Sequence, residues 1–160
     1  MDARMTDPAF ALHARGRRQT PPVLQGVAAS GRLDGVLFTL TLRQTWCNRS
    51  GRNLEAIYSF PLPAQAVLLG FAAQFGARRV QGQVLARSQA ERVYEDALAG
   101  GDAPALLEAG RDGLHTASLG NLLPGEQVVL EVRVAQLLAF EQGRLRLVVP
   151  VPESETGGIV

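Results

Sequence analysis

The chain has 160 residues and a formal net charge of +1, which allows one domain with a sizeable core and argues against a dedicated nucleic-acid surface. All 16 basic side chains are arginines, so Schiff-base chemistry, lysine general bases and the phosphate-loop lysine are excluded. Cys47 is the only cysteine, which excludes an intrachain disulfide and a cysteine-rich metal site.

The first 22 residues mix charge, alanine and proline without a sustained period, so we expect a flexible or loosely docked arm over residues 1–22. The basic cluster of Arg15, Arg17 and Arg18 is shorter than the runs that signal nucleic acid, and a solvated tail explains it best. Residues 1–18 lack the apolar centre of a signal peptide, and no segment has the roughly 18 consecutive apolar residues of a membrane span. The sequence alone therefore predicts a soluble, cytoplasmic chain.

Alternation of apolar and polar residues, the period of a strand with one buried face, recurs along most of the chain. The strand predicted at residues 23–29 ends at Ser30-Gly31. After the strand predicted at residues 54–60, Pro61 and Pro63 exclude pairing in the interior of a sheet. Strands are predicted at residues 23–29, 36–46, 54–60, 67–75, 78–85, 114–122, 128–134 and 145–149, the last two as a pair. Between the strands at 114–122 and 128–134, Pro124-Gly125 predicts a type II turn.

One helix is predicted among these strands, at residues 88–99. Ser88 and Glu91 have the spacing of a capping box, and Gly100 and Gly101 can close the other end. The apolar residues of the helix form one stripe at the 3.6-residue period: Ala90, Val93, Tyr94, Ala97 and Leu98. The expected fold is therefore mainly β, an antiparallel β-sandwich or barrel-like fold with one inserted α-helix.

The search for catalytic chemistry finds no complete site. The chain lacks the G-x-S-x-G, G-x-G-x-x-G and H-E-x-x-H patterns, so no catalytic residue, cofactor or metal ligand is assigned. We interpret His115 as a half-exposed strand histidine, because no serine or threonine shares its face. Glu91 and Glu95 are interpreted as a solvated helix face. Cys47 is interpreted as a small buried hydrophobe, although a thiol activated by a nearby arginine stays open.

Several stretches together carry a resemblance to a known family. The runs AERVYEDALAGG, ALLE and SLGNLLPGEQVVLEVRVAQLL, with YSFPLP upstream, resemble the VIT domain, the vault protein and inter-alpha-trypsin inhibitor domain. The resemblance implies a β domain over residues 23–150, followed by a polar tail at 151–160. It marks these positions as structural family-motif residues: Tyr58, Phe60, Pro61, Pro63, Tyr94, Leu107, Glu108, Gly120, Asn121, Pro124, Gly125 and Glu126.

Domains of this family usually precede a von Willebrand factor type A domain and are regarded as interaction or scaffolding modules without catalytic activity. The resemblance thus implies a non-catalytic protein-protein interaction module in a longer protein, with a downstream type A domain as one candidate partner. The charge, the lack of a long apolar segment and the missing motifs predict no cofactor, no nucleic-acid partner and no membrane insertion in this chain. Two alternatives stay open: a carbohydrate- or small-ligand-binding β-sandwich, and a hydrolase or transferase whose residues converge only in space.

Overall fold

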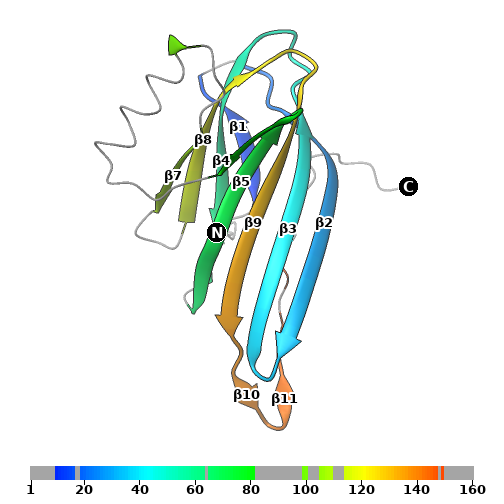
Figure 1. The fold of residues 1–160 in the computed structure, drawn as a ribbon, viewed down its shortest axis with the longest axis vertical. Helices are drawn as coiled ribbons and strands as arrows, with labels where there is room; N and C mark the ends of the chain where they lie inside the picture. Colours follow the sequence, from blue (N-terminus) through cyan, green and yellow to red (C-terminus); the bar gives the residue numbers. More distant parts are fainter. Residues whose placement is uncertain are drawn as a thin grey trace, which may run out of the picture.

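A computed structural model of the chain describes residues 10–16, 19–63, 65–81, 99–100, 105–109, 114–147 and 149. Within these ranges the chain forms two antiparallel sheets that face each other, with a short hairpin at one end (Figure 1). The sheets do not close into a barrel, and the predicted antiparallel β-sandwich is confirmed.

The smaller sheet has four strands in the order β1-β4-β8-β7. They are β1 (Ala11–Ala14), β4 (Leu54–Pro61), β8 (Leu114–Leu122) and β7 (Ala105–Ala109). The larger sheet has five strands in the order β2-β3-β9-β5-β6. They are β2 (Val23–Asp34), β3 (Leu37–Cys47), β9 (Gln127–Leu137), β5 (Ala66–Phe75) and β6 (Arg78–Gln81). The hairpin pairs β10 (Phe140–Glu141) with β11 (Arg144–Leu145).

The core fills the space between the two sheets, as the alternation predicts. Along β3 the side chains of Phe38, Leu40, Leu42 and Trp46 are buried, and β4 alternates between buried and half-buried from end to end. Aromatic rings from both sheets meet in the middle: Tyr58 and Phe60 of β4 each lie 6.0 Å, between ring centroids, from Phe71 of β5. This aromatic contact joins the sheets because rings bury a large apolar area in a small volume.

The N-terminal arm differs from the expectation. Residues 11–14 form β1, which pairs with β4, and the side chains of Phe10 and Leu12 are only 5% and 3% exposed. Both residues belong to the main core. The physical reason is that Phe10, Leu12 and Ala14 alternate with Ala11 and His13 and so present one apolar face. Such a short alternation is a weak signal in an arm that also contains three prolines and a basic cluster.

Two strand predictions also need correction. β9 does not pair with the 145–149 segment; its neighbours are β3 and β5, while β11 pairs with β10. The alternating pattern indicates which side chains share a face, but carries no information about the neighbouring strand. β2 continues through Ser30-Gly31 to Asp34, because Gly31 stays extended and bonds in register with Leu40.

The helix predicted at residues 88–99 lies outside the described residues, except for Ala99, which is helical. Tyr94, Glu91 and Glu95 lie outside them as well.

Candidate functional site

The motif residues of the 120–126 stretch lie at one end of the sandwich, where β8 turns into β9. Gly125 has a φ of 75°, as the predicted type II turn requires, and Asn121 has a φ of 57°. The Glu126 side chain caps the turn, since its Oε2 accepts a 2.9 Å bond from the Leu123 N–H. These residues make a tight reversal between β8 and β9, and their role as family-motif positions stays a prediction.

Asn48 holds this turn in place, and sequence reasoning missed it. The side chain is 0% exposed, and its Nδ2 lies 2.7, 2.9 and 3.1 Å from the carbonyl oxygens of Arg52, Leu122 and Leu123. Its Oδ1 accepts bonds from the backbone N–H and the hydroxyl of Ser50. An Asn-Arg-Ser-Gly stretch predicts a turn but gives no sign that its first side chain is buried.

The other motif residues lie apart from that turn. Tyr58 and Phe60 are core residues of β4 at 0% exposure, whereas Pro61 and Pro63 lie where the chain leaves β4. Leu107 and Glu108 are in β7, and Glu108 pairs in register with Thr116 of β8. The structure therefore brings the motif residues together in small groups and not in one site.

Two polar side chains are buried in the core between the sheets: Gln44, on β3 of the larger sheet, and Tyr58, on β4 of the smaller sheet. Among the described residues, Gln44 Nε2 and Tyr58 Oη have no hydrogen-bond partner, although Gln44 Oε1 accepts a 3.1 Å bond from Trp46 Nε1. Burial raises the pKa of the Tyr58 hydroxyl far above its ordinary value, and the nearby Gln44 side chain offsets only part of that rise. The two side chains are neighbours without a formed hydrogen bond.

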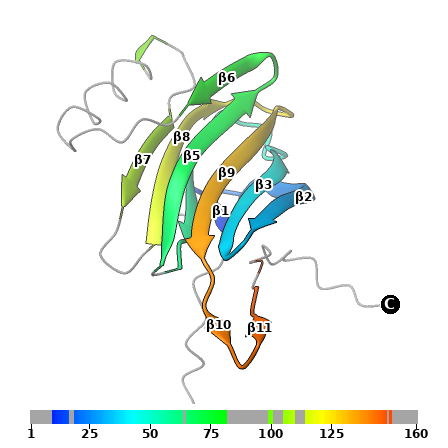
Figure 2. The ribbon, with the colours of Figure 1, turned by 60° about the horizontal axis from the view of Figure 1, so that its bottom comes forward.

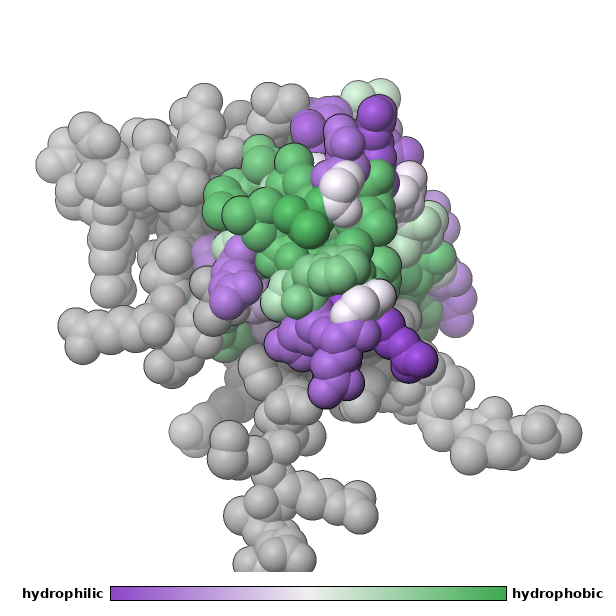
Figure 3. All heavy atoms as spheres, turned by 90° about the horizontal axis from the view of Figure 1, so that it is seen from below, coloured by the Kyte–Doolittle hydropathy of each residue, from purple (hydrophilic) through white to green (hydrophobic). Residues whose placement is uncertain are grey.

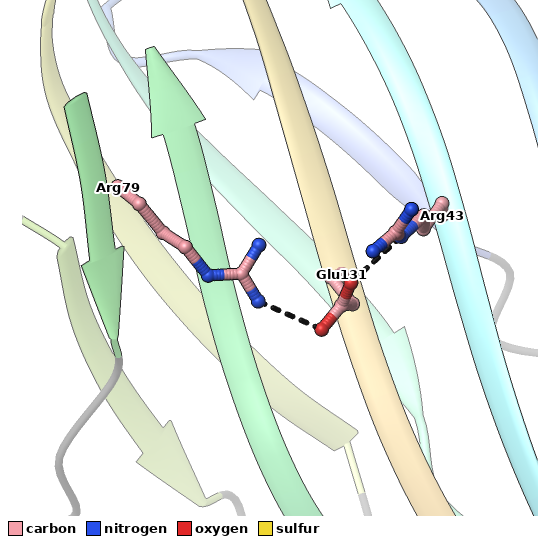
Figure 4. Close-up of polar contacts among 3 residues, drawn as sticks. All are labelled: Arg43, Arg79 and Glu131. Carbon is pink, nitrogen blue, oxygen red and sulfur yellow. Dashed lines mark hydrogen bonds and ion pairs between the residues drawn. The ribbon is translucent and has the colours of Figure 1, made fainter. Parts of the chain in front are cut away.

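A charged cluster lies on the outer face of the larger sheet (Figure 4). Glu131 of β9 accepts bonds from Arg43 Nε of β3 at 2.7 Å and from Arg79 Nη2 of β6 at 2.8 Å. Burial alone would raise the pKa of the Glu131 carboxyl, but the hydrogen bonds and charges of Arg43 and Arg79 outweigh it and hold the pKa below its ordinary value. Two positive groups share one carboxylate, so this face keeps a positive excess.

The end of the sandwich opposite the 120–126 turn is apolar, and we call it the apolar end. Its centre is a second cluster in which Phe38, Leu40 and Leu138 are buried, with Val134 and Leu145 packed on it. Around it lie exposed apolar side chains from the ends of β2, β3 and β9, from the β2–β3 turn and from β10: Leu33, Val36, Leu37, Leu137 and Phe140. Seen from below, apolar residues form one area bordered by hydrophilic ones (Figure 3).

A small cleft opens between the sheets next to this cluster. Phe38 and Leu40 of β3 and Val134 of β9 line one wall, and Pro61, Leu62 and Pro63 contribute to the lining from the end of β4. Its cavity volume is about 30 Å³. Sites for small molecules measure roughly 300–1,000 Å³, so this cleft suits a protein side chain better than a separate ligand.

His115 and Cys47, the two described residues that the sequence offered as candidates for catalysis, both pack against neighbouring residues of the sandwich. The His115 ring stacks on Phe60 with centroids 5.3 Å apart, and its side chain is half-buried, in line with its interpretation. Cys47 is 7% exposed, and its Sγ lies 3.8 Å from the Gly125 carbonyl oxygen.

No group of three or more His, Cys, Asp and Glu side chains that could hold a metal ion occurs in the described ranges. In the same ranges no helix has the length and apolarity to cross a membrane.

Comparisons with known proteins place most of the chain in one domain family. The sequence profile of the Vault protein inter-alpha-trypsin domain matches residues 24–134. The chain is 29% identical over 121 residues to a mouse protein mono-ADP-ribosyltransferase, PARP4, covering 76% of this chain and 6% of that protein. It is 26% identical to a von Willebrand factor A domain-containing protein of Dictyostelium discoideum (64% of this chain, 11% of that protein). It is 31% identical to rat von Willebrand factor A domain-containing protein 5A (61% and 12%).

Proposed function

This chain belongs to the vault protein inter-alpha-trypsin (VIT) domain family, and we propose that it is a non-catalytic interaction module whose apolar end packs against a von Willebrand factor type A domain of the same polypeptide. The chain spans only 6–12% of the length of the relatives described above, some of which are named for a type A domain. Those names support a type A domain as the partner.

The observation that carries the proposal is the exposure of large side chains at the apolar end. Leu137 is 61% exposed and Phe140 is 67% exposed, beside a cluster whose inner members are buried. Contiguous exposed apolar patches on soluble domains mark interaction sites, and contacts between domains of one chain bury such patches.

The path of the chain favours a partner in the same polypeptide. β9 ends at this end of the sandwich, and the hairpin of β10 and β11 continues from it (Figures 1 and 2). Beyond the hairpin, Leu147 and Val149 are 45% and 37% exposed. A domain that follows would be tethered beside the patch, and tethering raises its effective concentration to the millimolar range on short linkers.

The alternative of a small-ligand or carbohydrate binder has less support. The cleft at the apolar end is small, and the exposed large hydrophobic side chains of the described residues include one aromatic, Phe140. Carbohydrate sites commonly present several aromatic faces or calcium carboxylates.

The test uses the native gene product. Its intact mass, measured by denaturing mass spectrometry after immunocapture, should exceed the 17.1 kDa of this chain several-fold. Hydroxyl-radical footprinting should then give lower oxidation of Leu137 and Phe140 in the native product than in the 160-residue chain. A mass near that of the chain alone, or equal oxidation in both samples, would overturn the proposal.

A matched pair of variants makes the test specific. Leu137→Ser should increase proteolytic separation of the two domains, because it removes an exposed apolar contact without opening the core. Leu123→Ser is the control: Leu123 is 53% exposed and lies just before β9, at the other end of a strand about 35 Å long. The same response in both variants would locate the contact elsewhere.

A further inference from the structure

The strand β2 is an unusually long free edge. It has 12 residues and pairs with β3 on one side, and no described strand pairs with its other side. Within the described residues, the other edge strands of the two sheets, β1, β6 and β7, cover 4, 4 and 5 residues. A long edge presents a row of backbone N–H and C=O groups, to which an extended segment of another chain can add as a further strand.

β2 also lacks most of the features that normally protect an edge. It contains no proline or lysine, and its one register shift lies near its start, between Leu24 and Gly26. From Gly26 to Asp34 it runs in unbroken register with β3. Its core-facing positions carry Val27, Ala29 and Leu33, without an inward-pointing charge. Val27 and Leu33 are 40% and 51% exposed, so an added strand would find apolar surface on that face.

The outer face beside β2 indicates which charge such a segment carries. Register places Ala28 next to Arg43 and Arg32 next to Thr39. Arg43 donates only its Nε to Glu131, and its side chain is 59% exposed. Arg32 is exposed on β2 itself. Acidic side chains on the outer face of an added strand would therefore meet positive charge.

The sheet already contains the contact that this requires. Arg79 of β6 pairs in register with Gln74 of β5, and its side chain crosses β5 diagonally to Glu131 of β9, two strands away (Figure 4). Arg43 is likewise separated from a strand added at the free edge by one strand, on which its register partner is the small residue Ala28. A carboxylate opposite Ala28 would lie two strands from Arg43 and directly in line with it, a shorter span than the diagonal one that Arg79 bridges.

We propose that β2 binds an extended acidic segment of a partner protein as the sixth strand of the larger sheet. Apolar residues of the segment would join Val27, Ala29 and Leu33, and its carboxylates would face Arg32 and Arg43. A second copy of this chain is a poorer occupant, since pairing two β2 strands would place the arginines of both copies on one face. The inference concerns the free edge of β2, which shares Leu33 with the apolar end, and it does not rest on the proposed function.

The test measures binding of capped peptides of about nine residues, a usual strand length. In one peptide valine alternates with glutamate, and in the control valine alternates with arginine. The acidic peptide should bind the 160-residue chain with saturation and slow amide hydrogen exchange in residues 26–34, and the basic peptide should do neither. Absence of saturable binding at about 1 mM peptide, or binding without slower exchange in β2, would overturn the proposal.

Three variants separate strand addition from general charge attraction. Arg43→Gln should weaken binding about fivefold, while Arg79→Gln, which removes the other arginine from Glu131 far from the edge, should leave it unchanged. Val27→Lys adds positive charge but points it inward at the edge, so it should abolish binding. Stronger binding by Val27→Lys would mean simple charge attraction, and concentration-dependent dimers that mask residues 26–34 would mean self-pairing. Either result would overturn the proposal.

Discussion

Asn48, just after β3, donates an Nδ2 hydrogen to the carbonyl oxygen of Leu122, at the end of β8, over 2.9 Å. One buried amide thereby joins the two sheets at the end opposite the apolar end. The same nitrogen also lies within bonding distance of the Arg52 and Leu123 carbonyls.

Asn48→Ala should lower the free energy of unfolding by about 2–4 kcal/mol, because it removes the donor from the buried Leu122 carbonyl and from two partly buried carbonyl groups. Urea denaturation followed by tryptophan fluorescence of Trp46 measures this. Asn53→Ala is the matched control, since the bond of Asn53 to Asn121 is exposed and should change stability by about 0.5 kcal/mol or less. Equal losses in the two variants would contradict the role given to Asn48.

Tyr58→Phe should raise the free energy of unfolding by about 1 kcal/mol. The hydroxyl is buried without a formed hydrogen bond, so its removal recovers a desolvation cost and keeps the ring contacts with Phe60 and Phe71. Differential scanning calorimetry checks the sign. Tyr58→Ala should instead lose about 3–5 kcal/mol, as a large aromatic removed from a core does. A destabilised Tyr58→Phe would mean that the hydroxyl is hydrogen-bonded in solution.

The cluster of Glu131 with Arg43 and Arg79 should make stability depend on pH in the acid range. Because the folded-state pKa of Glu131 is lowered, the contribution is present above the ordinary glutamate value of about 4.3 and is lost as pH falls through the folded-state value. At pH 7 we expect Glu131 to contribute about 1 kcal/mol, since the side chains of Arg43 and Arg79 are 59% and 41% exposed to solvent.

The measurement compares wild type with Glu131→Gln in urea at several pH values. The stability difference between them should shrink below about pH 4, where the carboxyl of the unfolded chain and then that of the folded chain become protonated. A difference that stays constant from pH 7 to pH 3 would show that the charge on Glu131 contributes nothing.

Gly31 and Phe38 should show strong energetic coupling. A Cβ added at Gly31 would lie 2.7 Å from the Phe38 ring, so Gly31→Ala requires the ring to move. We expect a loss of about 1 kcal/mol in wild type. In a Phe38→Ala background the same change should stabilise the chain by up to about 1 kcal/mol, because alanine has less conformational freedom to lose. A double-mutant cycle gives the coupling, and additive effects would contradict the contact.

The sequence predicted most strands and the inner face of β3, because alternation follows directly from the pleat. It did not reveal the partners of β9, since any amphipathic strand can pair with another. Gln44 sits at a core-facing position of β3, where the pattern alone predicts an apolar residue. The apolar end was not predicted for a related reason. The sequence does not distinguish Leu137 and Phe140 from buried strand residues, and only the fold shows that no described element covers them.

Because β9 lies between β3 and β5, the larger sheet can form only late in synthesis. During synthesis the hairpin of β2 and β3 and that of β5 and β6 emerge first, and nothing joins them in the sheet until residues 127–137 arrive. The contact between Arg43 and Glu131 closes a separation of 88 residues. Folding of the larger sheet therefore waits for the last long strand to leave the ribosome. A nascent chain stalled at residue 126 would hold two unjoined hairpins, the state in which exposed strand edges are most open to chaperones and to aggregation.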